Sequence, residues 1–341
     1  MSEHLVPPAG DADAVAPGRR SPLLDLDGAV EADAPDSGVA AHYGELTVEQ
    51  RRLERGEGFV DLSHRDVLTV TGPDRLTWLH SLTTQHLESL PPGVRTEVLV
   101  LTPQGRIEHA FEGVDDGTTF WAHTEPGAGA ALVTFLDRMR FMMRVEVADV
   151  SDAHAVLGRV EPGSDGAPGR AVWAIEPRAD VASWPERHGR PAGTWAWEAL
   201  RIASGTPRLG LDTDDRTIPN EVGLLERAVH LDKGCYRGQE TVARVHNLGR
   251  PPRRLTLLHL DGSADRLPAP GSPVERADAP GQAVGVLGSR GLHHELGPIG
   301  LALLKRSVPT DATLVVDGVA AAQELVVDPE VGLHVRPRSG G

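Results

Sequence analysis

Residues 232–254 read Asp-Lys-Gly-Cys-Tyr-Arg-Gly-Gln-Glu-Thr-Val-Ala-Arg-Val-His-Asn-Leu-Gly-Arg-Pro-Pro-Arg-Arg, and the interpretation of the whole chain starts from this segment. It holds six basic and two acidic residues, a net charge of +4, in a chain of 341 residues whose net charge is −15. Clustered cations attract phosphate and carboxylate groups, so the segment predicts a local anion site. The acidic balance of the remaining chain argues against a general nucleic-acid binder.

The only cysteine of the chain, Cys235, lies in this segment between Lys233 and Arg237. The pattern from Gly238 onward predicts a helix to about residue 247, which places the thiol shortly before a helix N-terminus. The helix dipole and the flanking cations would favour the thiolate form. The alternative is a small buried hydrophobic residue in a tight glycine turn. A lone cysteine excludes an intramolecular disulfide and a self-contained cysteine-ligated cluster.

Outward from this segment, apolar patterns alternate between strand and helix periods without a glycine-rich dinucleotide turn. This favours an α+β fold over a parallel dinucleotide-binding sheet. Short apolar runs separated by Gly and Pro predict a small β-barrel over 251–335. The acidic, Ala- and Pro-rich stretch 1–44 predicts a disordered tail. We expect the α+β region to cover 45–250, with a break between two intertwined subdomains near 150.

Residues 233–240, Lys-Gly-Cys-Tyr-Arg-Gly-Gln-Glu, resemble the signature of the YgfZ family of folate-binding proteins. Flanking stretches at 71–75, 104–107, 201–207 and 218–221 are also similar, and the resemblance covers roughly 45–330. It implies the fold of the glycine-cleavage T-protein, an aminomethyltransferase, with several domains around a central folate channel and a C-terminal β-barrel. It also implies a tetrahydrofolate-binding accessory protein that supports assembly or repair of iron–sulfur proteins and, indirectly, tRNA modification.

The resemblance assigns roles to individual residues. Cys235 would be the reactive group, taking a one-carbon unit, forming a mixed disulfide or sharing a cluster with a partner. A reduced folate needs an aromatic or apolar slot for its pterin and cations for its glutamate tail. The candidate folate-binding residues are Lys233, Gly234, Tyr236, Gly238, Gln239, Glu240, Arg106, Glu108, Trp197, Arg201 and Arg244. The alternatives are that Trp197 belongs to the core and that Arg201 lies on an exposed helix face.

A second hypothesis is a folate-dependent aminomethyltransferase or one-carbon transferase of the T-protein class, and a third is a scaffold that has lost folate binding. The T-protein has an aspartate near its first hairpin glycine and a glutamate in a helix, where this sequence has Glu108 and Ala203. Both departures weigh against the transferase. Whether the chain is an enzyme is left open.

The expected partners are a reduced folate and iron–sulfur client or assembly proteins, without direct nucleic-acid binding, membrane binding or a metal site. The N-terminus lacks the basic and apolar regions of a signal peptide. Together with the lone cysteine, this predicts a cytoplasmic location.

Overall fold

The computed structural model describes residues 19–163 and 169–330. The chain forms two compact units that are interleaved in sequence. The first unit contains 1–68, 123–133 and 149–197, and the second contains 69–122, 134–148 and 198–341. Each unit is assembled from three separate segments, so neither corresponds to one continuous stretch of the chain. The predicted domain limits near 150 and 250 stay predictions.

The first unit is built on a four-stranded sheet in the order β10-β9-β3-β11. Its strands are β3 (Gly58–Asp61), β9 (His154–Glu161), β10 (Arg170–Pro177) and β11 (Arg190–Ala192). The pairs β3–β9 and β9–β10 are antiparallel, and β3–β11 is parallel. Helices α1 (Leu46–Glu54) and α4 (Trp184–His188) belong to this unit, whereas α5 (Thr194–Ala203) begins in it and ends in the second.

Residues 19–44 correct the prediction of a disordered tail. They form a 3₁₀ helix at Pro22–Asp25 and a two-stranded sheet of β1 (Val30–Glu31) and β2 (Ala40–His42). Leu23 joins a buried cluster with Phe59 and Trp184. Short apolar runs are hidden when composition is averaged over a whole acidic stretch, yet each can bury its side chains against an existing core. Residues 1–18 lie outside the described residues.

A five-stranded sheet has the order β5-β6-β7-β4-β8. Its strands are β4 (Asp66–Thr71), β5 (Arg95–Leu101), β6 (Ile107–Asp115), β7 (Thr119–Thr124) and β8 (Glu146–Asp149). In the sequence, α2 (Arg75–Leu82) and α3 (Gly129–Arg138) lie between these strands, and α6 (Leu225–Ala228) and α7 (Gln239–Leu248) follow them. The mixed fold confirms the α+β prediction. None of the described helices is long and apolar enough to cross a membrane.

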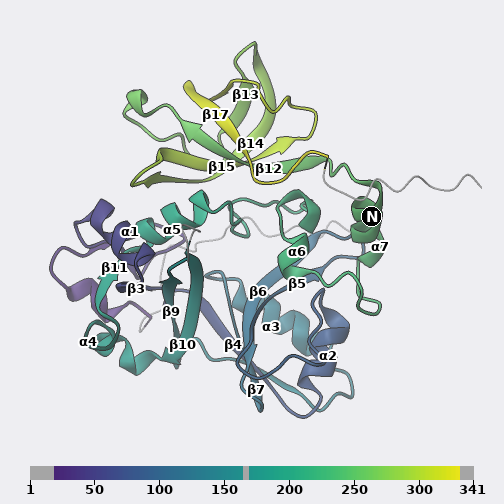
Figure 1. Ribbon diagram of the computed structural model, residues 1–341. Helices are drawn as coiled ribbons and strands as arrows, with labels where there is room; N and C mark the ends of the chain where they lie inside the picture. Colours follow the sequence, from purple (N-terminus) through teal and green to yellow (C-terminus); the bar gives the residue numbers. More distant parts are fainter. Residues whose placement is uncertain (1–18, 164–168, 331–341) are drawn as a thin grey trace, which may run out of the picture. The chain divides into compact units, whose positions relative to one another are not determined.

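The predicted C-terminal barrel is confirmed as a closed barrel in the order β12-β15-β14-β13-β16-β17 (Figure 1). Its strands are β12 (Arg253–Leu260), β13 (Pro273–Arg276), β14 (Ala279–His293), β15 (Gly297–Lys305), β16 (Leu314–Val316) and β17 (Val319–Leu325). Closure pairs every strand on both sides, which removes exposed sheet edges. Its interior is filled by aliphatic side chains such as Leu258, Leu287 and Leu304.

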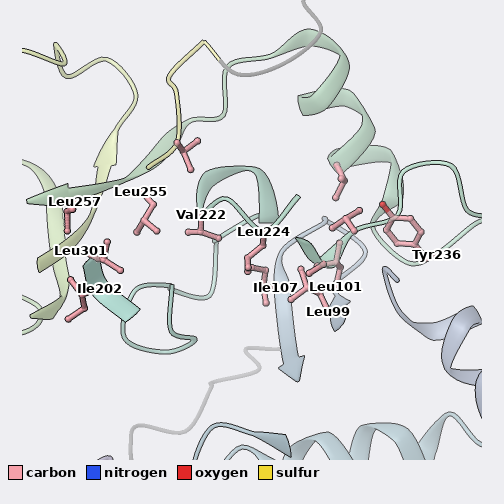
Figure 2. Packing of buried hydrophobic residues seen from close by; sticks show 14 of the residues in the cluster. Leu99, Leu101, Ile107, Ile202, Val222, Leu224, Tyr236, Leu255, Leu257 and Leu301 are labelled. Carbon is pink, nitrogen blue, oxygen red and sulfur yellow. The ribbon is translucent and has the colours of Figure 1, made fainter. Parts of the chain in front are cut away.

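One buried cluster of the second unit places the signature segment (Figure 2). It combines side chains of the β5–β6 hairpin, the signature and the barrel, among them Leu99, Leu101, Ile107, Tyr236, Leu255 and Leu301. Burying each such side chain stabilises the fold by roughly 1.5–3 kcal/mol. The tyrosine of the signature is therefore a core residue that fixes the position of its loop.

Candidate functional site

The signature loop, defined here as residues 230–238, is anchored first by Lys233. Its ammonium donates hydrogen bonds to the carbonyl oxygens of His80 at 2.5 Å, Thr83 at 2.6 Å and Gln85 at 3.0 Å. The last carbonyls of a helix lack partners within it and form the negative end of its dipole, so an ammonium is favourable at the end of α2. Burial nevertheless lowers the pKa of Lys233 to about 8. All three N–H donors are in use, which makes this lysine an anchor of the loop.

Two glycines bring the signature against the β5–β6 hairpin. Gly238 has a φ of +81°, and a Cβ there would lie 2.5 Å from the carbonyl oxygen of Thr102. Gly105 has a φ of +78°, and a Cβ there would lie 2.6 Å from the Cβ of Thr241. Only glycine suits both the left-handed backbone and the space. The hairpin turn and the first turn of α7 therefore meet backbone to backbone.

An ion pair joins the same two segments next to the glycines. Arg237 Nη1 lies 2.8 Å from Glu108 Oε2, and both side chains are about one-third exposed. The guanidinium also lies 6.0 Å from the centre of the Phe135 ring, which contacts the His109 ring at 5.4 Å. Burial lowers the pKa of His109, so that ring is neutral near pH 7. The structure thus brings the predicted site residue Glu108 to the signature, where it binds Arg237.

Cys235 is free and exposed on this anchored loop. A Cβ added at the preceding residue, Gly234, would meet nothing within 4 Å, so the loop is also open at that position. Helix α7 begins at Gln239, close to the predicted start. The two flanking cations bind other groups, Lys233 the helix carbonyls and Arg237 Glu108. A thiol on a held but open loop is accessible to a large partner, such as another protein.

Arg201 has a role that the sequence did not indicate. Its guanidinium lies 2.7 Å from Glu198 and 3.0 Å from Asp212, and it donates to Ser289 Oγ at 2.6 Å. A further hydrogen bond to the Thr206 carbonyl completes the use of its five N–H donors. The two carboxylates raise the pKa of Arg201 against its burial. This arginine ties α5 to β14 of the barrel and has no donor left for a folate carboxylate.

The other candidates divide into paired, buried and free side chains. Arg244 and Glu240 form an exposed ion pair at 2.7 Å along α7. Trp197 is buried in the first unit, where its ring would contact a Cβ added at Gly158 at 3.2 Å. Arg106 is half-buried, and within residues 19–163 and 169–330 its guanidinium makes no hydrogen bond or ion pair. Among the candidate arginines, Arg106 therefore has donors to offer.

One polar residue of interest, His123, was absent from the predicted site. It is fully buried in the first unit, with its ring 4.5 Å from that of Trp173. Neither ring nitrogen has a hydrogen-bond partner among the described residues. Burial, with the nearby charge of Arg65, lowers its pKa well below the usual value. Alternation along β7 places His123 on the face opposite the buried Phe120 and Ala122, so no sequence signal marked it as buried or without partners.

Comparisons with known proteins agree with this fold. No protein-family model matches the chain. A tRNA-modifying protein YgfZ from Edwardsiella ictaluri is 26% identical over 244 residues, covering 61% of this chain and 72% of the relative. A mitochondrial homologue of the iron–sulfur cluster assembly factor IBA57 from Pyricularia oryzae is 24% identical over 316 residues, covering 80% and 79%.

The fold has a close counterpart in a solved structure. Glycine cleavage system aminomethyltransferase T from Bartonella henselae superposes with a TM-score of 0.73, at 15% identity, over 91% of this chain and 97% of that one. Fold and site therefore define a protein of the aminomethyltransferase fold that carries an exposed signature cysteine. Within that fold the chain is similar to YgfZ proteins, in agreement with the resemblance of residues 233–240.

Proposed function

We propose that this protein is a tetrahydrofolate-binding accessory factor for the assembly or repair of iron–sulfur proteins, and that it affects tRNA modification through them. The observation that carries the proposal is the exposed Cys235 on a loop anchored at Lys233, Tyr236 and Gly238. The names of the YgfZ and IBA57 relatives support it. A free exposed thiol suits a reducing compartment, so the proposed location is the cytoplasm.

The donor set fits an anionic ligand at the β5–β6 hairpin. Arg106 is next to Gly105, and its guanidinium binds no other group within the described part of the chain. The hairpin is held against the signature by the ion pair of Glu108 with Arg237. In this proposal Arg106 binds the glutamate tail of the folate through charge-assisted hydrogen bonds. Lys233 and Arg201 bind other groups of the chain and do not contact the ligand in this proposal. A bound reduced folate would supply a carrier for one-carbon units.

Cys235 acts on a protein partner in this proposal. Its thiolate either contributes one ligand to a cluster whose other ligands come from the partner, or attacks a partner disulfide and releases one partner thiolate. Both routes need the thiol to be reachable, and exposure meets that need. The anchored loop keeps the sulfur in one place, which lowers the entropy cost of the encounter.

The T-protein alternative is supported at the level of the fold. The solved aminomethyltransferase is 15% identical to this chain. Two departures weigh against its reaction here, because Glu108 stands where the transferase pattern has an aspartate and Ala203 where it has a glutamate. An aminomethyltransferase reaction would also give the signature thiol of Cys235 no role.

Two measurements test the proposal. Anaerobic calorimetry with tetrahydrofolate should show saturable binding to the wild type and to Cys235→Ala. In a strain lacking the gene, the wild type should restore the activity of [4Fe–4S] enzymes and tRNA thiolation, and Cys235→Ala should not. Full restoration by Cys235→Ala would show that the thiol is not needed for the function. Absence of folate binding would support the third hypothesis, a scaffold that has lost folate binding.

A further inference from the structure

The segment after α3 exposes apolar side chains in a way that the folded chain does not explain. Residues 139–144, called here the tip, include Phe141 at 83% exposure, Met142 at 97% and Met143 at 37%. Single exposed apolar residues are ordinary, but three in a row are not. Phe141 also has a φ of +45°, a conformation that bulky residues rarely adopt. Strain of this kind is often found at functional positions.

The tip is firmly mounted at both of its ends. Trp78 Nε1 donates to the carbonyl oxygen of Met139 at 3.1 Å. Arg144 donates three hydrogen bonds to Asp74, two from its side chain at 2.6 and 3.0 Å and one from its backbone N–H at 2.9 Å. Both partners lie at α2, Trp78 within the helix and Asp74 directly before it. The exposed side chains are therefore held out by defined contacts.

The same helix carries the signature loop. Lys233 binds the carbonyl oxygen of His80, two residues beyond Trp78. An α-helix rises about 1.5 Å per residue, so the eight residues of α2 span roughly 12 Å. A second link runs from Arg237 to the ring of Phe135 on α3, just before the tip. The tip and the loop of Cys235 are thus mounted on one short helix.

The charge around the tip differs from that of the whole chain. Arg138 makes no ion pair or hydrogen bond through its side chain within the described part of the chain. Arg140 reaches only Asp137, at 3.7 Å, and both of these side chains are about half exposed. Residues 137–144 carry three arginines and one aspartate, a local net charge of +2 on a protein of net charge −15, although Arg140 and Arg144 are paired with Asp137 and Asp74. The complement of this tip is an apolar pocket bordered by carboxylates on another protein.

We propose that the tip is the docking surface for the iron–sulfur protein that Cys235 serves, with Phe141 and Met142 inserted into an apolar pocket rimmed by acidic residues. This inference rests on the function proposed above, and it names the surface by which the partner is recognised. Aromatic and methionine side chains are effective anchors at interfaces. A protein partner is favoured over an anionic lipid surface because the acidic chain would be repelled by one, and because the neighbouring thiol needs a protein partner.

The first test separates docking from folate binding. Phe141→Ser/Met142→Ser in the full chain should bind tetrahydrofolate like the wild type and unfold at a similar temperature. In the deletion strain it should fail to restore [4Fe–4S] enzyme activity, as Cys235→Ala fails. Val286→Ser, at a half-exposed valine of the barrel, is the matched control and should restore activity fully. Restoration by the double variant would overturn the inference.

The second test identifies the occupant. A photoreactive phenylalanine analogue at position 142 should crosslink to iron–sulfur proteins, identified by mass spectrometry, and the same analogue at position 286 should not. Arg138→Glu/Arg140→Glu should reduce the yield at position 142 severalfold. Crosslinks to a second copy of this chain, or sedimentation of the protein with phosphatidylglycerol vesicles, would overturn the assignment. If Cys235→Ala fails in cells while the tip variant succeeds, only the docking inference fails; if both succeed, the proposed function fails.

Discussion

Gly105 and Gly238 meet so closely that a Cβ on Gly238 would lie 2.8 Å from the Cα of Gly105. The contact joins the turn of the β5–β6 hairpin to the start of α7, and both residues have positive φ. It is a direct backbone contact between the signature and the hairpin that carries Arg106 and Glu108. The orientation of the candidate site therefore depends on two residues that have no side chain.

Gly238→Ala should destabilise the protein by at least about 2 kcal/mol, because it combines left-handed backbone strain with a backbone clash. Urea unfolding monitored by circular dichroism measures the free energy of unfolding. Gly234→Ala is the matched control in the same loop, since its Cβ meets nothing within 4 Å. It should change stability by no more than about 0.5 kcal/mol. Equal effects of the two variants would contradict the close approach.

Lys233→Met should cost roughly 1–3 kcal/mol or more, because buried carbonyl oxygens at the end of α2 lose their donor. The effect depends on pH, since the folded pKa of about 8 lies below the ordinary 10.5. Between these values the unfolded chain keeps a proton that the folded chain has lost, so wild-type stability rises with pH there. Urea unfolding at pH 7.5 and 9.5 should show this rise in the wild type and not in the variant. Parallel pH profiles would refute it.

His123 should make the protein sensitive to acid. Its folded pKa lies well below 6.5, so as the pH falls through about 6.5 the unfolded chain binds a proton that the folded chain does not. Stability is lost over that range. His123→Leu should therefore lose less stability than the wild type between pH 7.5 and 5.5, by chemical denaturation. An identical loss would show that this residue does not carry the pH dependence.

Arg106→Ala should weaken tetrahydrofolate binding about tenfold or more, since a charge-assisted hydrogen bond contributes roughly 1.5–3 kcal/mol. Arg244→Ala is the control, because that arginine forms an exposed pair with Glu240 and should change affinity less than about twofold. Calorimetry on both variants gives the ratio of dissociation constants. Comparable losses would move the tail site away from the hairpin.

Local patterns in the sequence determined much of the fold. The strand at Asp66–Thr71, the helix from Gln239 and the runs of the barrel follow from periodicity and turn residues, which act over a few neighbours. The motif at 233–240 identified the relatives because it specifies so many positions in a row. The ordered structure of residues 19–44 was not predicted, because burial of a few aliphatic side chains there depends on a core formed elsewhere in the chain.

Tertiary structure alone decided what each charged side chain does. Lys233 donates a hydrogen bond to the carbonyl oxygen of Thr83, 150 positions away in the sequence. The donors of Arg201 bind two carboxylates and Ser289 of the barrel. Among the described residues the Arg106 guanidinium has no partner, and Phe141 is exposed on a segment that Met139 and Arg144 attach to Trp78 and Asp74 at α2. The physical reason is that a charged group takes its role from the partners and the solvent around it, and folding brings those partners from distant parts of the chain. The sequence by itself determined the fold class and the candidate site residues, and folding decided which of those side chains bind other groups of the chain and which keep donors for a ligand.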